Sequence, residues 1–154
     1  MTLPNYIREL LDENKRSVIR HKTERLHMST VNVNEFATWL RGHALPPYGQ
    51  GKCAKFVRLA LEHGGAHSAG HPYHAKDWGP TLLRNGFHSI TVEKPETFLA
   101  MKGDVAVIQP TSSSSSGHIQ GFDGKQWISD FVQPDFWPGP AYRTEKPNYV
   151  IYRP

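Results

Sequence analysis

The stretch Gly49-Gln-Gly-Lys-Cys-Ala-Lys-Phe-Val-Arg58 joins a loop rich in glycine and proline to an amphipathic helical pattern. Apolar residues recur at helical spacing and Gly64-Gly65 follows as a stop, so the pattern predicts a helix over residues 52–63. Cys53 falls in the first turn of this helix, where unpaired backbone N–H groups and the helix dipole favour a thiolate over a thiol. The stretch is therefore typical of a nucleophilic cysteine at a helix start.

A histidine later in the chain supports this interpretation of Cys53 over the alternative, a small buried side chain, which is what most free cysteines are. His118 begins a strand expected over residues 118–122. A histidine on a sheet that packs against the nucleophile's helix can hydrogen-bond the sulfur and act as general base, then as general acid. A single strand histidine is more often structural, so the hypothesis rests on the pair.

The third member of such a site depends on the register of a hairpin whose turn is marked by Asp123-Gly124. A strict two-residue turn places Ser129 opposite His118, whereas a three-residue loop with a bulge places Asp130 there. We prefer Asp130, because a carboxylate can orient an imidazole and stabilise the imidazolium, while a serine hydroxyl can do only part of this. Ser129 remains the alternative.

Helical patterns fill the first half of the chain and strand patterns the second, which predicts an α+β fold with N-terminal helices packed on a small antiparallel sheet. A first helix is expected over residues 4–25. A second begins after a capping residue, Asn32, and stops at Gly42, and a short helix after residue 77 is capped by Asp77. The expected strands are residues 87–92, 104–109, 118–122, 126–131 and 149–153.

The composition fits one catalytic domain over residues 1–154, with residues 1–43 as its N-terminal helical part. A chain of 154 residues with 38% hydrophobic content can bury a core without staples, and its single cysteine cannot form an internal bridge. No stretch approaches the ~18 apolar residues of a membrane span, and no export signal is recognised. We therefore expect a soluble protein made in the cytoplasm. Its net charge of +4 mildly favours polyanionic neighbours.

Three fragments in order, residues 50–58, 102–108 and 117–119, carry a family resemblance. Together with the hairpin that follows, they resemble the CHAP and NlpC/P60 group of papain-like cysteine peptidases and amidases, which cut amide or peptide bonds in bacterial peptidoglycan. The resemblance implies a papain-like fold, no cofactor and no metal. It also implies that Cys53 is the nucleophile, that His118 is the base, and that an acidic or polar third residue is present, for which Asp130 fits best.

The closing segments, residues 127–139 and 149–153, are also similar to small amidase effectors that bacteria deliver through type VI secretion. That resemblance implies a protein carried by the secretion apparatus into the periplasm of a target bacterium. The implied partners are peptidoglycan as substrate, a component of the apparatus and a cognate immunity protein as inhibitor, with neither nucleic acid nor membrane insertion. The chain departs from many relatives in its run of five serines, residues 112–116, where they have a compact loop.

Three further residues are candidates for binding substrate. Gln50 or Tyr48, in the loop before the nucleophile, could add a second hydrogen-bond donor for the oxyanion, although loop residues of these types are more often solvated or packed. Trp137 could line a substrate groove, together with Tyr73 and Trp78. Packing in an aromatic core is at least as common a role for such side chains.

Two other functions fit parts of the sequence. A zinc-dependent amidase is suggested by four histidines within twelve residues, His63, His67, His71 and His74. Gly64-Gly65 should end the helix between the first two, and no HExxH pattern is present. A non-catalytic domain that binds nucleic acid or wall polymer is suggested by the basic N-terminal third, but acidic residues interrupt it, as on the solvated face of a helix.

Overall fold

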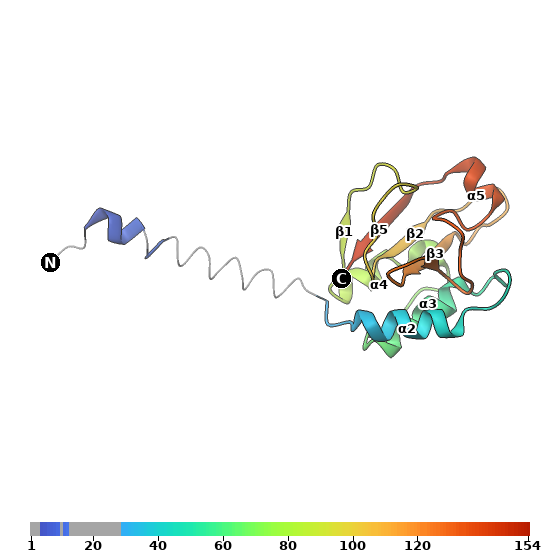
Figure 1. Ribbon diagram of the computed structural model, residues 1–154, viewed down its shortest axis with the longest axis horizontal. Helices are drawn as coiled ribbons and strands as arrows, with labels where there is room; N and C mark the ends of the chain where they lie inside the picture. The colour runs from blue at the N-terminus through green and yellow to red at the C-terminus, as the bar shows by residue number, and fades with distance from the viewer. Residues whose placement is uncertain (1–3, 10, 13–28) are drawn as a thin grey trace.

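Residues 4–9, 11–12 and 29–154 are described by a computed structural model of the chain (Figure 1). Residues 5–9 and 11–12 are helical, in agreement with the start of the helix expected over residues 4–25, and the remainder of that helix lies outside the described residues. Within the described part, no helix combines the length and the apolar character needed to cross a bilayer.

The strands in the described part of the chain form an antiparallel sheet with the order β1-β5-β2-β3-β4. They are β1 His88–Ile90, β2 Val105–Ile108, β3 His118–Phe122, β4 Trp127–Ile128 and β5 Tyr149–Arg153. β3 and β5 have the predicted bounds, while β4 is much shorter than the expected 126–131. The predicted α+β class is confirmed.

The central strand, β2, is covered on both faces. Val105 and Val107 pack into one core with the helices, while Ala106 and Ile108 pack into a second core with aromatic residues of the C-terminal part. Successive side chains of a strand point to opposite faces of the sheet. A strand that is buried on both faces therefore has apolar residues at every position, as β2 does. Figure 1 shows α2 and α3 along one side of the sheet and α5 on the other.

The first helix of the helical layer is α2, Val33–His43. Asn32 caps it as predicted, because its Oδ1 accepts a hydrogen bond of 3.0 Å from the backbone N–H of Glu35. The prediction that Gly42 stops the helix is wrong, since α2 continues to His43 and Ala44 follows as the C-cap. One glycine costs a helix only about 1 kcal/mol, which tertiary packing readily offsets.

The second helix of this layer is α3, Cys53–His63, which has the predicted position and the predicted stop at Gly64. Its buried side chains, Val57, Ala60 and Leu61, belong to the core that covers β3. Helix α3 also packs directly against β3. As a result, the start of α3 and the start of β3 face one hollow, which is described below.

The next helix begins differently from the prediction. Asp77 does not cap it but ends a short 3-10 turn, η1 (Ala75–Asp77), and Trp78 is the N-cap of α4 (Gly79–Arg84). The buried Trp78 ring anchors this junction in the core. The final helix, α5 (Pro140–Glu145), was not predicted, because six residues contain too few turns for a helical period to be recognised.

Both registers expected for the hairpin after β3 are wrong. The observed pairs are Gly121 with Ile128 and Phe122 with Trp127, so residues 123–126 form a four-residue loop. Asp123 stabilises this loop, because its Oδ1 accepts hydrogen bonds of 2.9 Å from two backbone N–H groups of the loop. The longer loop shifts the returning chain, so neither Ser129 nor Asp130 stands opposite His118.

Candidate active site

A cleft of about 820 Å³ contains Cys53 and His118 in its walls. Its other walls come from the loop at residues 47–51, the serine run at residues 114–116, and the C-terminal segment between residues 130 and 143. The structure thus brings together segments from three distant parts of the chain around one cysteine and one histidine.

Cys53 is half-buried at the first position of α3. Burial is the largest influence on its thiol and raises the pKa above the ordinary value, and the negative charge of Asp130 raises it further. Backbone N–H groups of Ile119, Ala54 and Cys53 itself act in the opposite direction. The net result differs from the thiolate expected at a helix start, because desolvation outweighs the amides of the first turn. The resting group is a thiol.

His118 is buried at the first position of β3, and its Nε2 lies 3.0 Å from Oε1 of Gln133. The amide nitrogen of Gln133 donates to Oε1 of Gln120 at 2.8 Å, which fixes the orientation of the Gln133 side chain. Oε1 of Gln133 must then be an acceptor, so His118 Nε2 carries the hydrogen and donates it. The other ring nitrogen, Nδ1, is left with a lone pair that can accept a proton.

The pKa of His118 is lowered to about 4, first because burial disfavours the charged ring. The hydrogen bond to Gln133 and the negative charge of Asp130 act in the opposite direction. The imidazole is therefore neutral near pH 7, and the cleft holds an uncharged thiol and imidazole in place of an ion pair.

Gln133 is the residue that the sequence hypothesis missed. It is 1% exposed and reaches His118 because the chain reverses just after β4, where Ile128 bridges Val132. Its backbone N–H then donates to the carbonyl of Trp127 at 2.9 Å. A sequence signal for this network is weak: glutamines at positions 120 and 133 lie in otherwise apolar or aromatic surroundings, where a buried amide needs partners.

Asp130 is buried in the wall of the same cleft, but its carboxylate serves the loop before the nucleophile. Oδ2 accepts hydrogen bonds from the backbone N–H groups of Gln50 at 2.6 Å and Lys52 at 3.0 Å. In residues 29–154 no hydrogen bond joins Asp130 to His118, while Ser129 Oγ donates weakly to Asp130 Oδ1 at 3.4 Å. The carboxylate thus fixes the approach to α3 and acts on the two reactive groups through its charge.

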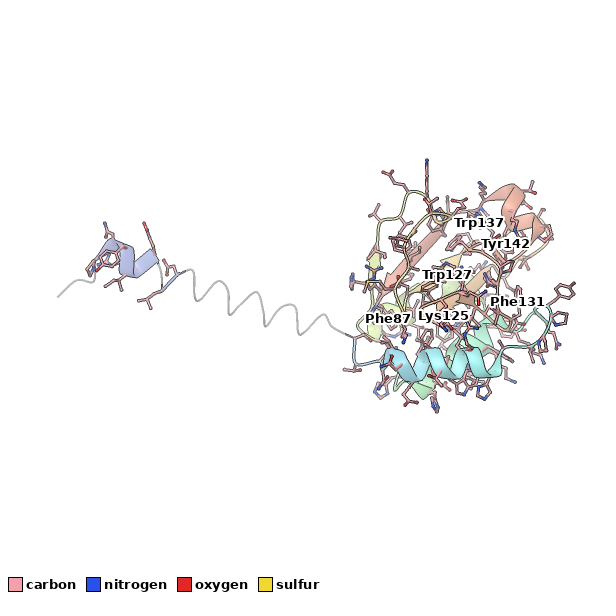
Figure 2. The ribbon with its side chains drawn as sticks, viewed as in Figure 1. Phe87, Lys125, Trp127, Phe131, Trp137 and Tyr142 are labelled. Carbon is pink, nitrogen blue, oxygen red and sulfur yellow. The ribbon has the colours of Figure 1, made fainter. Side chains whose placement is uncertain are left out.

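Tyr142, on α5, closes part of the cleft over the imidazole. Its ring centroid lies 5.9 Å from that of His118, and Ser114 lines the cleft with it. Burial raises the pKa of the Tyr142 phenol, so it remains a neutral hydrogen-bonding group. It is labelled with Phe131, another lining residue, in Figure 2.

The serine run is an ordered rim of the cleft. Thr111 forms a β-bridge with Ser114, and the backbone N–H and hydroxyl of Ser112 donate to Glu145 at 2.9 and 2.7 Å. These bonds attach the run to the end of α5. The rim is therefore attached to the helix that carries Tyr142.

The candidate substrate-binding residues separate into two groups. Tyr48 lines the cleft and is 75% exposed, and the backbone of Gln50 is held by Asp130 next to it. Trp137 does not line this cleft, which corrects the expectation for it: its ring is buried in the second core, and its Nε1 donates to Glu96 at 2.9 Å.

None of the aromatic and histidine residues between positions 63 and 78 lines the active-site cleft. Trp78 is buried in the helical core, while Tyr73 is exposed. The four clustered histidines have separate partners where the structure gives them, such as Glu35 for His63 and Ser116 for His74. No group of three potential metal ligands occurs in the part of the chain that the structure describes.

No protein-family model and no curated protein matches the chain, but solved structures are similar to it. One similar structure is the type VI native effector–immunity complex Tae3–Tai3 from Ralstonia pickettii. It has a TM-score of 0.71 and 42% identity, over 79% of this chain and 98% of that one. The selenomethionine form of the same complex has a TM-score of 0.69 and 43% identity, over 79% of this chain and 100% of that one.

Proposed function

The chain belongs to the Tae3 family of type VI effectors, and from this premise we propose that it is a cysteine-dependent amidase of bacterial peptidoglycan. The observation that carries the proposal is the pair at the cleft, Cys53 at the start of α3 and His118 at the start of β3. Gln133 holds Nε2–H of the imidazole, which leaves Nδ1 free to receive the thiol proton. The fold and the order of these residues also support a CHAP or NlpC/P60-like, papain-like enzyme.

In the proposed reaction, Cys53 attacks the carbonyl carbon of the scissile amide while its proton passes to Nδ1 of His118. The backbone N–H of Cys53 stabilises the oxyanion, with Tyr48 as the nearby side-chain candidate. The imidazolium then gives its proton to the leaving amine, so the C–N bond breaks and a thioester remains on the sulfur. Water, deprotonated by His118, hydrolyses the thioester and restores the thiol.

Gln133 and Asp130 divide the role that the sequence assigned to Asp130 alone. Gln133 orients the ring through a neutral hydrogen bond, and Asp130 stabilises the transient imidazolium by its charge while it fixes the loop of residues 50–52. A neutral orienting group together with a nearby carboxylate lets His118 rest as a base and still accept a proton during the reaction.

The biological setting is proposed from the relatives. Because the similar structures are effector–immunity complexes, we infer a cognate immunity protein for this chain, with the cleft as its target. Delivery by the type VI apparatus would bring the enzyme to peptidoglycan in the periplasm of a target bacterium.

The experiment that tests the proposed function is digestion of purified peptidoglycan by wild-type protein after treatment with either a thiol-alkylating reagent or a metal chelator. Alkylation should abolish the release of fragments, and chelation should leave it unchanged. Loss of activity on chelation would favour the zinc amidase, and no fragment release by untreated protein would favour the binding domain.

The pH dependence of the reaction follows from the neutral imidazole. Because the pKa of His118 is about 4, the base remains unprotonated from neutral pH down to nearly that value, so kcat/KM should fall only near pH 4. Gln133→Glu puts a carboxylate against Nε2, which favours the imidazolium and should move this acid limb to higher pH by about one unit or more. Rates of fragment release between pH 3.5 and 8 measure the acid limb of the wild type and that of Gln133→Glu. A wild-type acid limb near pH 6.5 contradicts the neutral pair.

Asp130→Asn should lower kcat roughly tenfold, the cost of losing one charge-assisted interaction. The amide retains an acceptor for the loop but no charge. Because the carboxylate raises the pKa of Cys53, the pH at which the thiol is alkylated at half its maximal rate should also fall. Ser129→Ala is the matched control and should be close to wild type. A damaging Ser129→Ala with a silent Asp130→Asn would reverse these roles.

A further inference from the structure

A second hollow, of about 200 Å³, lies across the first turn of α3 from the active-site cleft. One wall is formed by residues of α3: Ala54, Lys55 and Arg58. The other is formed by His71 and Tyr73, in the loop between α3 and η1, and by Trp78. Since Ala54 follows Cys53 directly, the two hollows share the start of this helix as a common wall.

The loop that forms the far wall of this hollow is fastened to the rim of the active-site cleft. His74 Nδ1 lies 2.8 Å from Ser116 Oγ, and the backbone N–H of Lys76 donates to the carbonyl of Ser116 at 2.9 Å. Ser116 itself lines the cleft. The wall of this hollow and the rim of the cleft are thereby fixed relative to each other.

The hollow carries positive charge. Arg58 is bonded at 2.9 Å to Glu62, whose carboxylate also accepts from Ser68 and acts on His71, so Arg58 adds little net charge. Lys55 is exposed and forms no ion pair within the described residues. No acidic side chain lies in the first turn of α3, where the helix dipole adds positive potential. The local field therefore favours an anion.

Aromatic rings stand beside these cations. Tyr73 is 87% exposed, and its ring meets His74 edge-on at a centroid distance of 5.1 Å, which holds a large apolar surface in the solvent. The His71 ring stacks on Trp78 at 5.6 Å. An exposed ring and an ammonium group that line the same hollow suit a ligand with both an apolar stem and a negative end.

We propose that this hollow is a second substrate subsite that binds a free carboxylate of the peptide in peptidoglycan, with Lys55 as the cation and Tyr73 as the surface under the peptide stem. The proposal rests on the proposed function, because it places the scissile bond at Cys53 and another part of the same peptide across the first turn of α3. Lys55 and Tyr73 are binding residues in it and take no part in the chemistry.

The test uses soluble peptidoglycan fragments whose peptide carboxylates are either free or converted to amides. With free carboxylates, Lys55→Ala should raise KM roughly tenfold, as expected for loss of a charge-assisted contact, and leave kcat nearly unchanged. Amidation should raise the KM of the wild type to that of the variant and have little further effect on the variant. Lys125→Ala, a change at an exposed lysine of the β3–β4 loop, is the matched control and should behave as wild type.

Tyr73 is tested by two variants. Tyr73→Phe keeps the ring and should bind as wild type, whereas Tyr73→Ala should raise KM for both forms of the fragment. An unchanged KM for Lys55→Ala on fragments with free carboxylates, or an equal increase on amidated fragments, overturns the subsite.

Binding in the Cys53→Ala background separates this proposal from the proposed function. Calorimetry on the free-carboxylate fragments requires no turnover, and adding Lys55→Ala should weaken binding roughly tenfold. A wild-type protein that cleaves no peptidoglycan refutes the proposed function. Equal binding by the single and double variants refutes the subsite, whatever the activity of the wild type.

Discussion

Cys53→Ala should abolish peptidoglycan hydrolysis, with a loss of roughly a thousandfold or more, and leave the fold intact. The side chain is half-buried at the first position of α3, where alanine fits the helix and only a sulfur atom is lost. The backbone N–H groups that stabilise the oxyanion remain, but without the sulfur no thioester can form. Fragment release by wild type and variant at equal concentration measures the loss.

The control for Cys53→Ala is its thermal unfolding, which should stay within a few degrees of the wild type because the substitution leaves the core of α3 unchanged. A variant that is folded and still digests peptidoglycan at the wild-type rate contradicts the assignment of Cys53 as nucleophile.

His118→Ala should cause a loss of the same order, because the resting thiol needs a base to become a nucleophile. The two residues act as one unit, so the double variant with Cys53→Ala should be little worse than either single variant. His118→Gln is the matched variant that keeps a polar side chain near Gln133 if the smaller alanine disturbs packing.

Alkylation of the thiol gives a second readout for His118. Without a neighbouring base, the Cys53 thiol should react more slowly at neutral pH, although the protein remains folded. Losses that multiply in the double variant, or thiol reactivity that is independent of His118, would mean that the two residues do not cooperate.

The helical start of the site was predictable because its determinants are local. The glycine-rich loop, the amphipathic run after Cys53 and the stop at Gly64 fall within one short stretch, and α3 starts one residue after the predicted start and ends at the predicted residue. The bounds of β3 were predicted equally well, because apolar residues follow His118 and Gly121 continues the run. Propensity and burial pattern agree at both elements.

The surroundings of His118 were less predictable, because they depend on a loop length and a chain reversal. Asp123-Gly124 indicated a turn, but Asp123 accepts bonds from two residues of a longer loop, which changes the register of everything that follows. The reversal after Ile128 then brings Gln133 to the imidazole and turns Asp130 toward the loop before α3. Neither step has a signature in side-chain periodicity.

Aromatic residues were the least predictable from sequence, because groove and core use the same residue types. Trp137 lies in the second core, while Tyr142, from an unpredicted helix of six residues, contacts His118. What distinguishes them is how the C-terminal segment packs over the sheet, which depends on contacts between residues distant in the sequence.

The measurement that tests the central claim most directly is mass analysis of the fragments that the wild-type protein releases from purified peptidoglycan, with Cys53→Ala as the blank. Hydrolysis of an amide bond predicts, for each cut, one new amino group and one new carboxyl group, with the mass of one water added across the two products. New sugar ends in place of these groups, or the same fragments from Cys53→Ala, would contradict a cysteine amidase at this cleft.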